Sequence, residues 1–282
     1  MKPRSIQPSH PAAGFSLLEL MTAGAVFLLL TMIMLQVVGQ TSIFTESGNR
    51  MMDASRSARI SLDTLATDLA TLVADYGTTI LTAKDPSTGN TSLAFLCASR
   101  ADSVNAGQTL RMAGVFYAIE PRSDAMAGGN VPMLCRGFTS LSWSDKIQSA
   151  LATVFNASQA ADPSVPADVL GESVFRMEAA FVLTDGTVVA TPPVLPGYGA
   201  AQALDLGKIK GLIIAVAALD KKTQKLFEGI TPSGMTALSA ALPPLASDGE
   251  TPLDVWSAAD LSAFPPPVRK NVRFFQRTIY LP

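Results

Sequence analysis

Few residues of this 282-residue chain could carry nucleophilic, acid–base or metal chemistry. The chain holds one histidine, His10, and two cysteines, Cys97 and Cys135. These three side chains cannot supply the four Cys/His ligands of a structural zinc site. His10 lies in a short polar N-terminal stretch that looks removable, and without it every histidine-dependent mechanism is lost. We therefore expect no enzyme, no metal and no cofactor.

Carboxylates remain as candidates for acid–base work. Five of them lie in loop-like regions: Asp162, Asp168, Asp248, Glu250 and Asp254. Their spacing matches neither a calcium-binding loop nor the carboxylate pair of a glycosidase, so a solvated surface is the better interpretation. The chain has 21 basic and 23 acidic side chains, and this near-neutral charge argues against nucleic acid as a partner.

One further carboxylate, Glu19, stands near the start of a long apolar segment. From Leu17 to Val38 the chain runs LLELMTAGAVFLLLTMIMLQVV, about 22 residues, enough to cross a hydrocarbon core as a helix. The basic residues Lys2 and Arg4 precede it, which favours a cytoplasmic N-terminus and an extracytoplasmic remainder. An unpaired carboxylate near the bilayer costs on the order of 2–3 kcal/mol or more, so we expect Glu19 to have a positively charged partner.

Two simpler interpretations of this segment compete. A cleaved secretory signal normally has an apolar core of only about 7–15 residues and ends at a small-x-small site. This segment is longer, and it carries an acid near its start. A plain signal anchor fits the length but leaves Glu19 unexplained.

The sequence Gly14-Phe15-Ser16-Leu17-Leu18-Glu19 resembles the prepilin cleavage and methylation motif of type IV pilins and type II secretion pseudopilins. The resemblance implies that a prepilin peptidase cleaves after Gly14 and methylates the new N-terminal residue, Phe15. It also implies a task for Glu19, whose carboxylate would pair with the α-amino group of a neighbouring subunit's Phe15 in a helical filament. A buried charge is tolerable when it is paired in this way.

The resemblance divides the chain into four parts. Residues 1–14 would be the cleaved leader and residues 15–41 the transmembrane and filament helix. Residues 42–77 would continue the stem as an amphipathic helix that ends at a glycine C-cap. Residues 78–282 would form an extracytoplasmic, β-rich domain. The stem shows apolar residues at three- and four-residue steps, namely Ile60, Leu62, Leu65, Leu69, Leu72, Val73 and Tyr76.

The β-rich part shows alternating or strongly apolar segments that predict strands. They are Leu93–Cys97, Val115–Ile119, Met133–Trp143, a hairpin over Ser173–Val189 around Asp185-Gly186, a central strand over Ile209–Leu219, and a final strand over Val272–Leu281. The Pro-rich stretch 231–267 is expected to be a surface insertion or loop with one short helix within 253–264. The predicted fold is α+β and type IV pilin-like, with a long N-terminal helix packed on an antiparallel sheet.

The order of these later segments resembles the J-type minor pseudopilins and similar minor pilins, apart from the long stretch 231–267. That resemblance implies a place in the tip complex of a secretion pseudopilus or pilus-like filament. The implied partners are prepilin peptidase, other pseudopilins or pilins, the inner-membrane assembly platform and membrane lipid. The alternative function is a membrane-anchored binding module, such as an adhesin or DNA-uptake receptor, that uses a pilin stem.

The two cysteines fall in strand-like segments of a domain expected outside the cytoplasm, where disulfides persist. An even count in an oxidising compartment favours a disulfide between Cys97 and Cys135. The bond needs Cα atoms within about 7 Å. The alternative is two buried thiols that behave as small apolar side chains.

Overall fold

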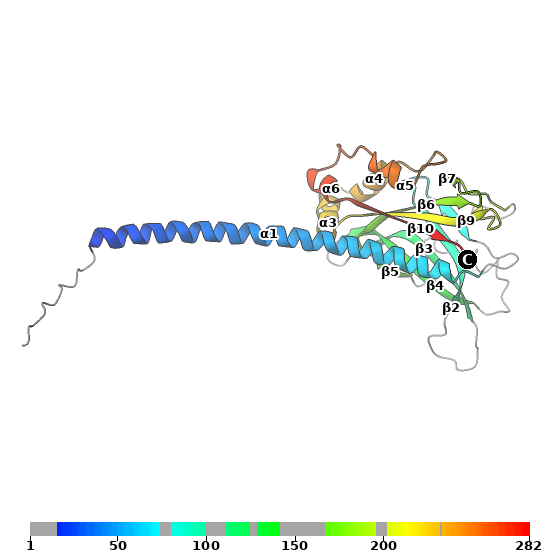
Figure 1. The fold of residues 1–282 in the computed structure, drawn as a ribbon, viewed down its shortest axis with the longest axis horizontal. Helices are drawn as coiled ribbons and strands as arrows, with labels where there is room; N and C mark the ends of the chain where they lie inside the picture. The colour runs from blue at the N-terminus through cyan, green and yellow to red at the C-terminus, as the bar shows by residue number, and fades with distance from the viewer. Residues whose placement is uncertain are drawn as a thin grey trace, which may run out of the picture. The chain divides into compact units, whose positions relative to one another are not determined.

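The computed structural model describes residues 16–73, 80–99, 111–124, 129–141, 167–195, 202–231 and 233–282. The chain divides into two units, Met1–Asn49 and Arg50–Pro282. Helix α1, Leu17–Ala70, supplies the described part of the first unit and the first element of the second (Figure 1). Gly14 and Phe15 lie outside the described residues.

The first unit is helical throughout its described part. The Glu19 amide donates to the Ser16 hydroxyl at 3.2 Å, so Ser16 caps the first turn. The hydroxyls of Thr31 and Thr41 each donate at 2.8 Å to the carbonyl four residues earlier. Their hydrogen-bonding capacity is met within the helix, which allows these polar residues to stand in an apolar surface.

In the second unit α1 buries one stripe of side chains. Ala54, Ala58, Leu62, Leu65 and Leu69 are buried at three- and four-residue spacing. The sequence predicted the three leucines, and the two alanines extend the stripe toward the N-terminus. The predicted stripe also contained Ile60, which is instead exposed.

The helix ends earlier than predicted, at Ala70 rather than beside Gly77. The Val73 amide donates to the carbonyl of Leu96 at 3.0 Å, and the Ala98 amide donates to the carbonyl of Thr71 at 2.9 Å. These backbone bonds to a strand replace the next helical turn. The prediction was wrong here because a tertiary partner competes with the local helix pattern.

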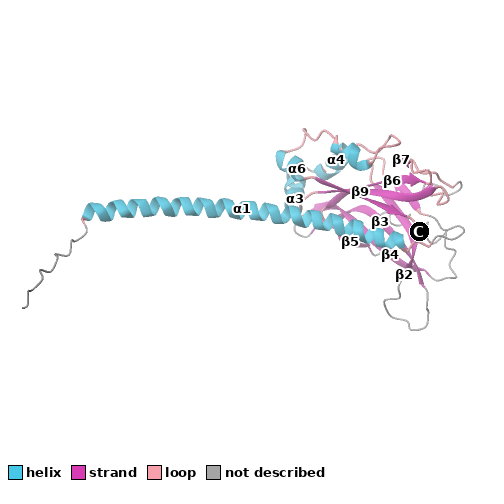
Figure 2. Cartoon of the chain, in the orientation of Figure 1, coloured by secondary structure: helices cyan, strands magenta, loops and turns pink. Residues whose placement is uncertain are grey.

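Two antiparallel sheets form the body of the second unit (Figure 2). The first has the order β5-β4-β3-β2-β1-β8 and contains β1 Leu81–Lys84, β2 Thr91–Ser99, β3 Arg111–Asp124, β4 Gly129–Leu141, β5 Ala167–Gly171 and β8 Gln202–Ala203. The second has the order β10-β9-β6-β7 and contains β6 Val174–Leu183, β7 Val188–Val189, β9 Ile209–Ala218 and β10 Arg273–Tyr280. The predicted α+β class is confirmed, as is the interior position of β9 between β10 and β6.

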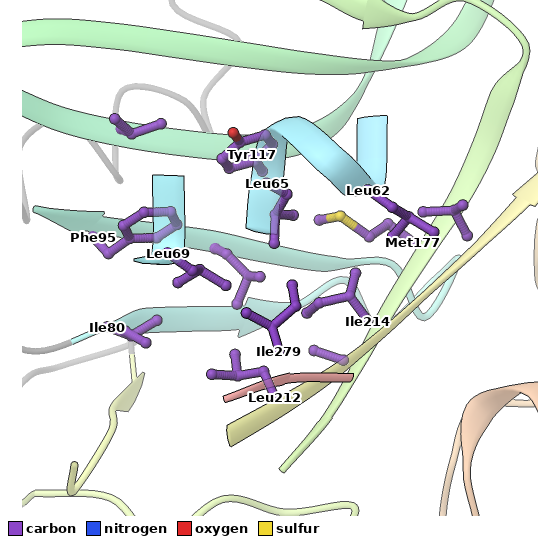
Figure 3. Packing of buried hydrophobic residues seen from close by; sticks show 14 of the residues in the cluster. Leu62, Leu65, Leu69, Ile80, Phe95, Tyr117, Met177, Leu212, Ile214 and Ile279 are labelled. Atoms are coloured by element: carbon purple, nitrogen blue, oxygen red, sulfur yellow. The ribbon is translucent and has the colours of Figure 1, made fainter. Parts of the chain in front are cut away.

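The main hydrophobic core joins α1 to both sheets. Figure 3 shows Leu62, Leu65 and Leu69 of α1 directed toward side chains from the two sheets. The residues labelled there are Ile80, which directly precedes β1, and the sheet residues Phe95, Tyr117, Met177, Leu212, Ile214 and Ile279. Each fully buried leucine contributes about 1.5–3 kcal/mol, so this contact sets the position of α1 in the second unit.

Four helices cover the opposite face of the second sheet: α3 Lys221–Ile230, α4 Gly234–Ala241, α5 Pro252–Ser257 and α6 Pro266–Asn271. They bury Met235, Leu238 and Trp256 against outward side chains of β6 and β9. The short helix predicted within 253–264 is present as α5, but the remainder of 231–267 is not simply a surface loop, because it also contains α4 and packs on the second sheet. The prolines indicated loop structure in the sequence, but Pro252 and Pro266 are the first residues of α5 and α6. At that position a backbone N–H has no partner within the helix, so proline loses no hydrogen bond there.

Candidate functional site

The N-terminal part of α1 exposes an unusually large apolar surface. Leu17 is 79% exposed and Phe27 69% exposed, and the other large apolar residues up to Val38 are similarly uncovered. Apolar patches of this extent mark a surface that another molecule or a bilayer covers. By length and composition this segment is a candidate membrane anchor.

Glu19 is the acidic residue of the first turn of α1, and its side chain is exposed. A carboxylate at this position interacts favourably with the positive end of the helix dipole. Within the residues that the structure describes, no cation forms an ion pair with Glu19. Any ionic partner of this carboxylate must therefore come from outside the described residues or from another molecule.

No family model matches the chain, and no curated protein matches it. Among solved structures, the chain is similar to a type IV-like pilin from Thermus thermophilus, with 14% sequence identity and a TM-score of 0.42. The match covers 81% of this chain and 95% of that one. With so low an identity and TM-score, this similarity supports no conclusion about function.

A charged cluster ties α1 to the first sheet. The Asp68 carboxylate of α1 accepts a hydrogen bond from the Tyr117 hydroxyl at 2.5 Å and from Nε of Arg136 at 2.7 Å. Burial, reinforced by the negative charge of Asp68, raises the pKa of Tyr117 well above its usual range. The pKa of Arg136 is also raised, because the contacts with Asp68 and Tyr117 outweigh the effect of burial. The Arg136 guanidinium therefore stays charged and the Tyr117 phenol stays neutral at neutral pH.

A second tie joins α1 to β10, where Arg277 pairs with Asp63 and the Arg59 guanidinium lies 6.0 Å from the centre of the Phe275 ring. Sequence analysis had not singled out these α1 charges for any role. Asp68 could have been singled out from the sequence, because it lies between Leu65 and Leu69 at the margin of the buried stripe.

A charge network with a fully buried ion pair at its centre lies on the outward face of β6. Arg176 and Glu178 have no exposed side-chain surface, and Nη2 of Arg176 lies 3.0 Å from Oε2 of Glu178. The other carboxylate oxygen of Glu178, Oε1, accepts hydrogen bonds from Nζ of Lys84 at 2.7 Å and from the backbone amide of Leu245 at 2.8 Å. Trp256 covers the Arg176 guanidinium, with 5.7 Å between the ring centre and Cζ. Burial lowers the pKa of Arg176, and Glu178 opposes that change.

This network joins three separate parts of the chain: β1, β6 and the segment between α4 and α5. Sequence analysis missed it. The Arg-x-Glu spacing in a strongly apolar strand could have indicated this pair. Residues two apart in a strand point to the same side, so a buried arginine and glutamate at that spacing can meet.

Two of the five carboxylates predicted in loops serve local structure, and two of the five lie in regular elements, Asp168 in β5 and Asp254 in α5. Asp254 completes the capping box of α5 with Thr251, and Asp248 accepts a bond from the amide of Ala190 at 3.1 Å. Asp168 and Glu250 are exposed, and Asp162 lies outside the described residues. Across the described ranges no three potential metal-ligating side chains come together.

The structure contradicts the predicted disulfide, because Cys97 and Cys135 are buried free thiols. Cys97 lies opposite Ala113 of β3, whereas Cys135 lies opposite Ala118 of the same strand. The cysteines are thus separated by a whole strand and by five residues along it, which places them on opposite faces of the sheet. Their Cα atoms are far beyond the roughly 7 Å that a disulfide allows.

We expect both thiols to be unreactive in the folded protein. Burial raises the pKa of Cys97 and of Cys135 to about 11, so little reactive thiolate exists at pH 8. Alkylation followed by intact mass measurement should add no label to the folded chain and two labels in denaturant without reductant. Protein purified from an oxidising compartment that takes up no label in denaturant would contradict the assignment of free thiols.

Proposed function

We propose that this protein is a prepilin-like filament subunit, anchored by α1 and processed at its N-terminus. The motif Gly14-Phe15-Ser16-Leu17-Leu18-Glu19 is the observation that carries the proposal. An exposed apolar helix that continues into an amphipathic half and packs on an antiparallel sheet supports it. A prepilin peptidase would cleave after Gly14 and methylate Phe15.

Assembly, rather than catalysis, is the proposed mechanism. The exposed apolar surface between Leu17 and Val38 first contacts lipid and then packs against equivalent helices of other subunits. Apolar contacts of this kind are not specific for one register. The Glu19 carboxylate supplies the register, because it is stable away from water only beside the α-amino group of a neighbouring subunit's Phe15.

The cellular setting follows from the same proposal. The uncleaved chain would be a single-pass protein of the bacterial inner membrane, with a cytoplasmic N-terminus and the second unit outside the cytoplasm. Its partners would be prepilin peptidase, the inner-membrane assembly platform, and other pilins or pseudopilins. The J-type resemblance of its later segments favours a minor subunit at the filament tip.

N-terminal mass analysis of membrane-fraction protein tests this proposal. In a host with prepilin peptidase the mature chain should begin at methylated Phe15, and without the peptidase it should keep the leader. Gly14→Val should block cleavage, because the branched side chain restricts the open backbone that the protease needs. Gly24→Val is the matched control, since a Cβ at Gly24 would meet nothing within 4 Å. A leader retained in both hosts would overturn the proposal.

A further inference from the structure

The outer edge of β10 has unused main-chain hydrogen-bonding groups. β10 is an end strand of the second sheet, where it pairs with β9. The amide of Leu281, just after β10, donates to the carbonyl of Lys210, so the odd-numbered residues of β10 direct their N–H and C=O groups toward β9. The even-numbered residues direct theirs away from the sheet, and among the described residues these groups have no hydrogen-bond partner. They belong to Phe274, Gln276, Thr278 and Tyr280.

The other sheet edges in the described ranges are short or covered. At β7, the Gly249 amide donates to the carbonyl of Val188 at 2.8 Å, and the Asp248 side chain accepts the amide of Ala190. β8 is two residues long, and β5 is five residues long with a shift in register beside β4. Such features protect proteins, because an uncovered strand is a template for another strand. β10 runs for eight residues without a proline or a shift in register, so it lacks that protection.

The charged side chains of β10 do not block its edge. Arg273 and Arg277 lie on the face of the sheet that contacts α1, and Arg277 pairs there with Asp63. The exposed side chains near the end of the strand are Thr278 and Tyr280, both of types that are frequent in strands. The edge therefore has the features of sheet edges to which extended peptides add through main-chain hydrogen bonds.

The charge around β10 indicates what kind of strand it would bind. Residues 261–282 include four basic side chains and no acidic one. The four are Arg269, Lys270, Arg273 and Arg277. Within the described residues the first three of them form no ion pair. An acidic segment beside β10 would place its carboxylates near cations that lack a counter-ion, which favours binding.

A second copy of this chain is the less suitable occupant. β10 and α1 run in the same direction, because Arg273 at the start of β10 contacts Met51, whereas Arg277 near its end pairs with Asp63. Two identical β10 edges pair antiparallel around a two-fold axis. That pairing would point the two α1 helices in opposite directions, which is incompatible with two helices anchored in the same membrane.

We propose that the β10 edge binds an extended, acidic segment of a different protein, which adds to the second sheet as a further strand. Main-chain hydrogen bonds to the even-numbered residues hold the segment. Its carboxylates pair with Arg269, Lys270 and Arg273, and its alternate side chains contact Phe275 on one face of the sheet and Tyr280 on the other. The preference for a different protein over a second copy rests on the proposed function, because it requires α1 to be a membrane anchor.

Binding of synthetic peptides to the full chain in detergent micelles, followed by fluorescence anisotropy, tests this proposal. The probe is a labelled peptide of alternating glutamate and valine that matches the eight residues of β10 in length. A version with lysine in place of glutamate should bind at least about tenfold more weakly at low salt. Two further versions carry N-methyl groups on either the valine or the glutamate amides. One of these two should also lose about tenfold or more in affinity, and its identity reports the direction of the added strand.

Amide hydrogen exchange, measured by NMR, locates the binding on the chain. The amides of Phe274, Gln276, Thr278 and Tyr280 should exchange more slowly when the acidic peptide is bound. Thr278→Pro removes one edge amide and leaves the pairing with β9 intact, so it should weaken binding about tenfold. Thr278→Val keeps the amide and is the matched control. The N-methylated peptides keep the test decisive if Thr278→Pro does not fold.

Each other outcome contradicts a stated part of the proposal. Binding that survives both patterns of N-methylation, or that leaves the edge amides unprotected, means that the peptide does not add to β10. Equal binding of the glutamate and lysine peptides refutes the acidic partner. If no peptide binds at about 1 mM, a free energy of only about −4 kcal/mol, the edge is not a binding site. Edge amides that become protected without peptide as the protein concentration rises would show that a second copy is the occupant.

These failures are separable from a failure of the proposed function. A chain that keeps its leader in a host with prepilin peptidase but binds the acidic peptide along β10 is no filament subunit, yet it has the edge site. A chain processed to Phe15 that binds none of the peptides retains the proposed function and lacks the edge site.

Discussion

Glu178→Ala should lower the free energy of unfolding by about 3–5 kcal/mol, because it leaves the buried Arg176 without its counter-ion. The substitution also removes the acceptor for Lys84 and for the amide of Leu245. The segment between α4 and α5 would then lose its polar tie to β6. Urea unfolding of the full chain in detergent micelles, followed by circular dichroism, measures the change.

Glu172→Ala is the matched control for this prediction. Glu172 is an exposed acid that pairs with Lys221, and exposed pairs contribute at most about 1 kcal/mol. The double variant Arg176→Met with Glu178→Leu should be more stable than Glu178→Ala alone, because apolar side chains of similar volume can replace a buried pair. Equal midpoints for Glu178→Ala and Glu172→Ala would show that the buried network contributes nothing beyond a surface pair.

Glu19→Val should leave processing at Gly14 intact but reduce incorporation into filaments at least about tenfold, because a buried α-amino group would lose its ionic partner. Glu19→Gln should fail similarly, since it keeps the shape of the side chain and removes only the charge. Immunoblots of sheared filament fractions, with N-terminal mass analysis of the membrane fraction, measure the two steps separately.

Thr31→Val is the control within the same helix. The Thr31 hydroxyl donates only to the carbonyl of Phe27 in its own helix, so its loss should not change incorporation. If Glu19→Gln assembled as efficiently as Thr31→Val, charge pairing by Glu19 would be disproved while the rest of the proposed function could stand.

Local patterns in the sequence predicted much of the fold. The three- and four-residue spacing from Leu62 to Leu69 identified part of the buried stripe of α1, because a helix places such residues on one face. Alternation identified β2 and β3, and Asp185-Gly186 marked the β6–β7 turn. The predictions were wrong where contacts between distant parts of the chain competed with local sequence preferences. Pairing with β2 ended α1 at Ala70, and burial against the second sheet made helices of the Pro-rich stretch.

The sequence by itself determined the features that depend on neighbouring residues: the motif from Gly14 to Glu19, the apolar segment of α1 and most strands. Only the tertiary structure decided which distant side chains meet. It joined Asp68 to Tyr117 and Arg136, brought Lys84 and Leu245 to Glu178, and placed Cys97 and Cys135 on opposite faces of a sheet. The physical reason is that these contacts depend on strand register and sheet order, which long-range packing sets and local spacing does not encode.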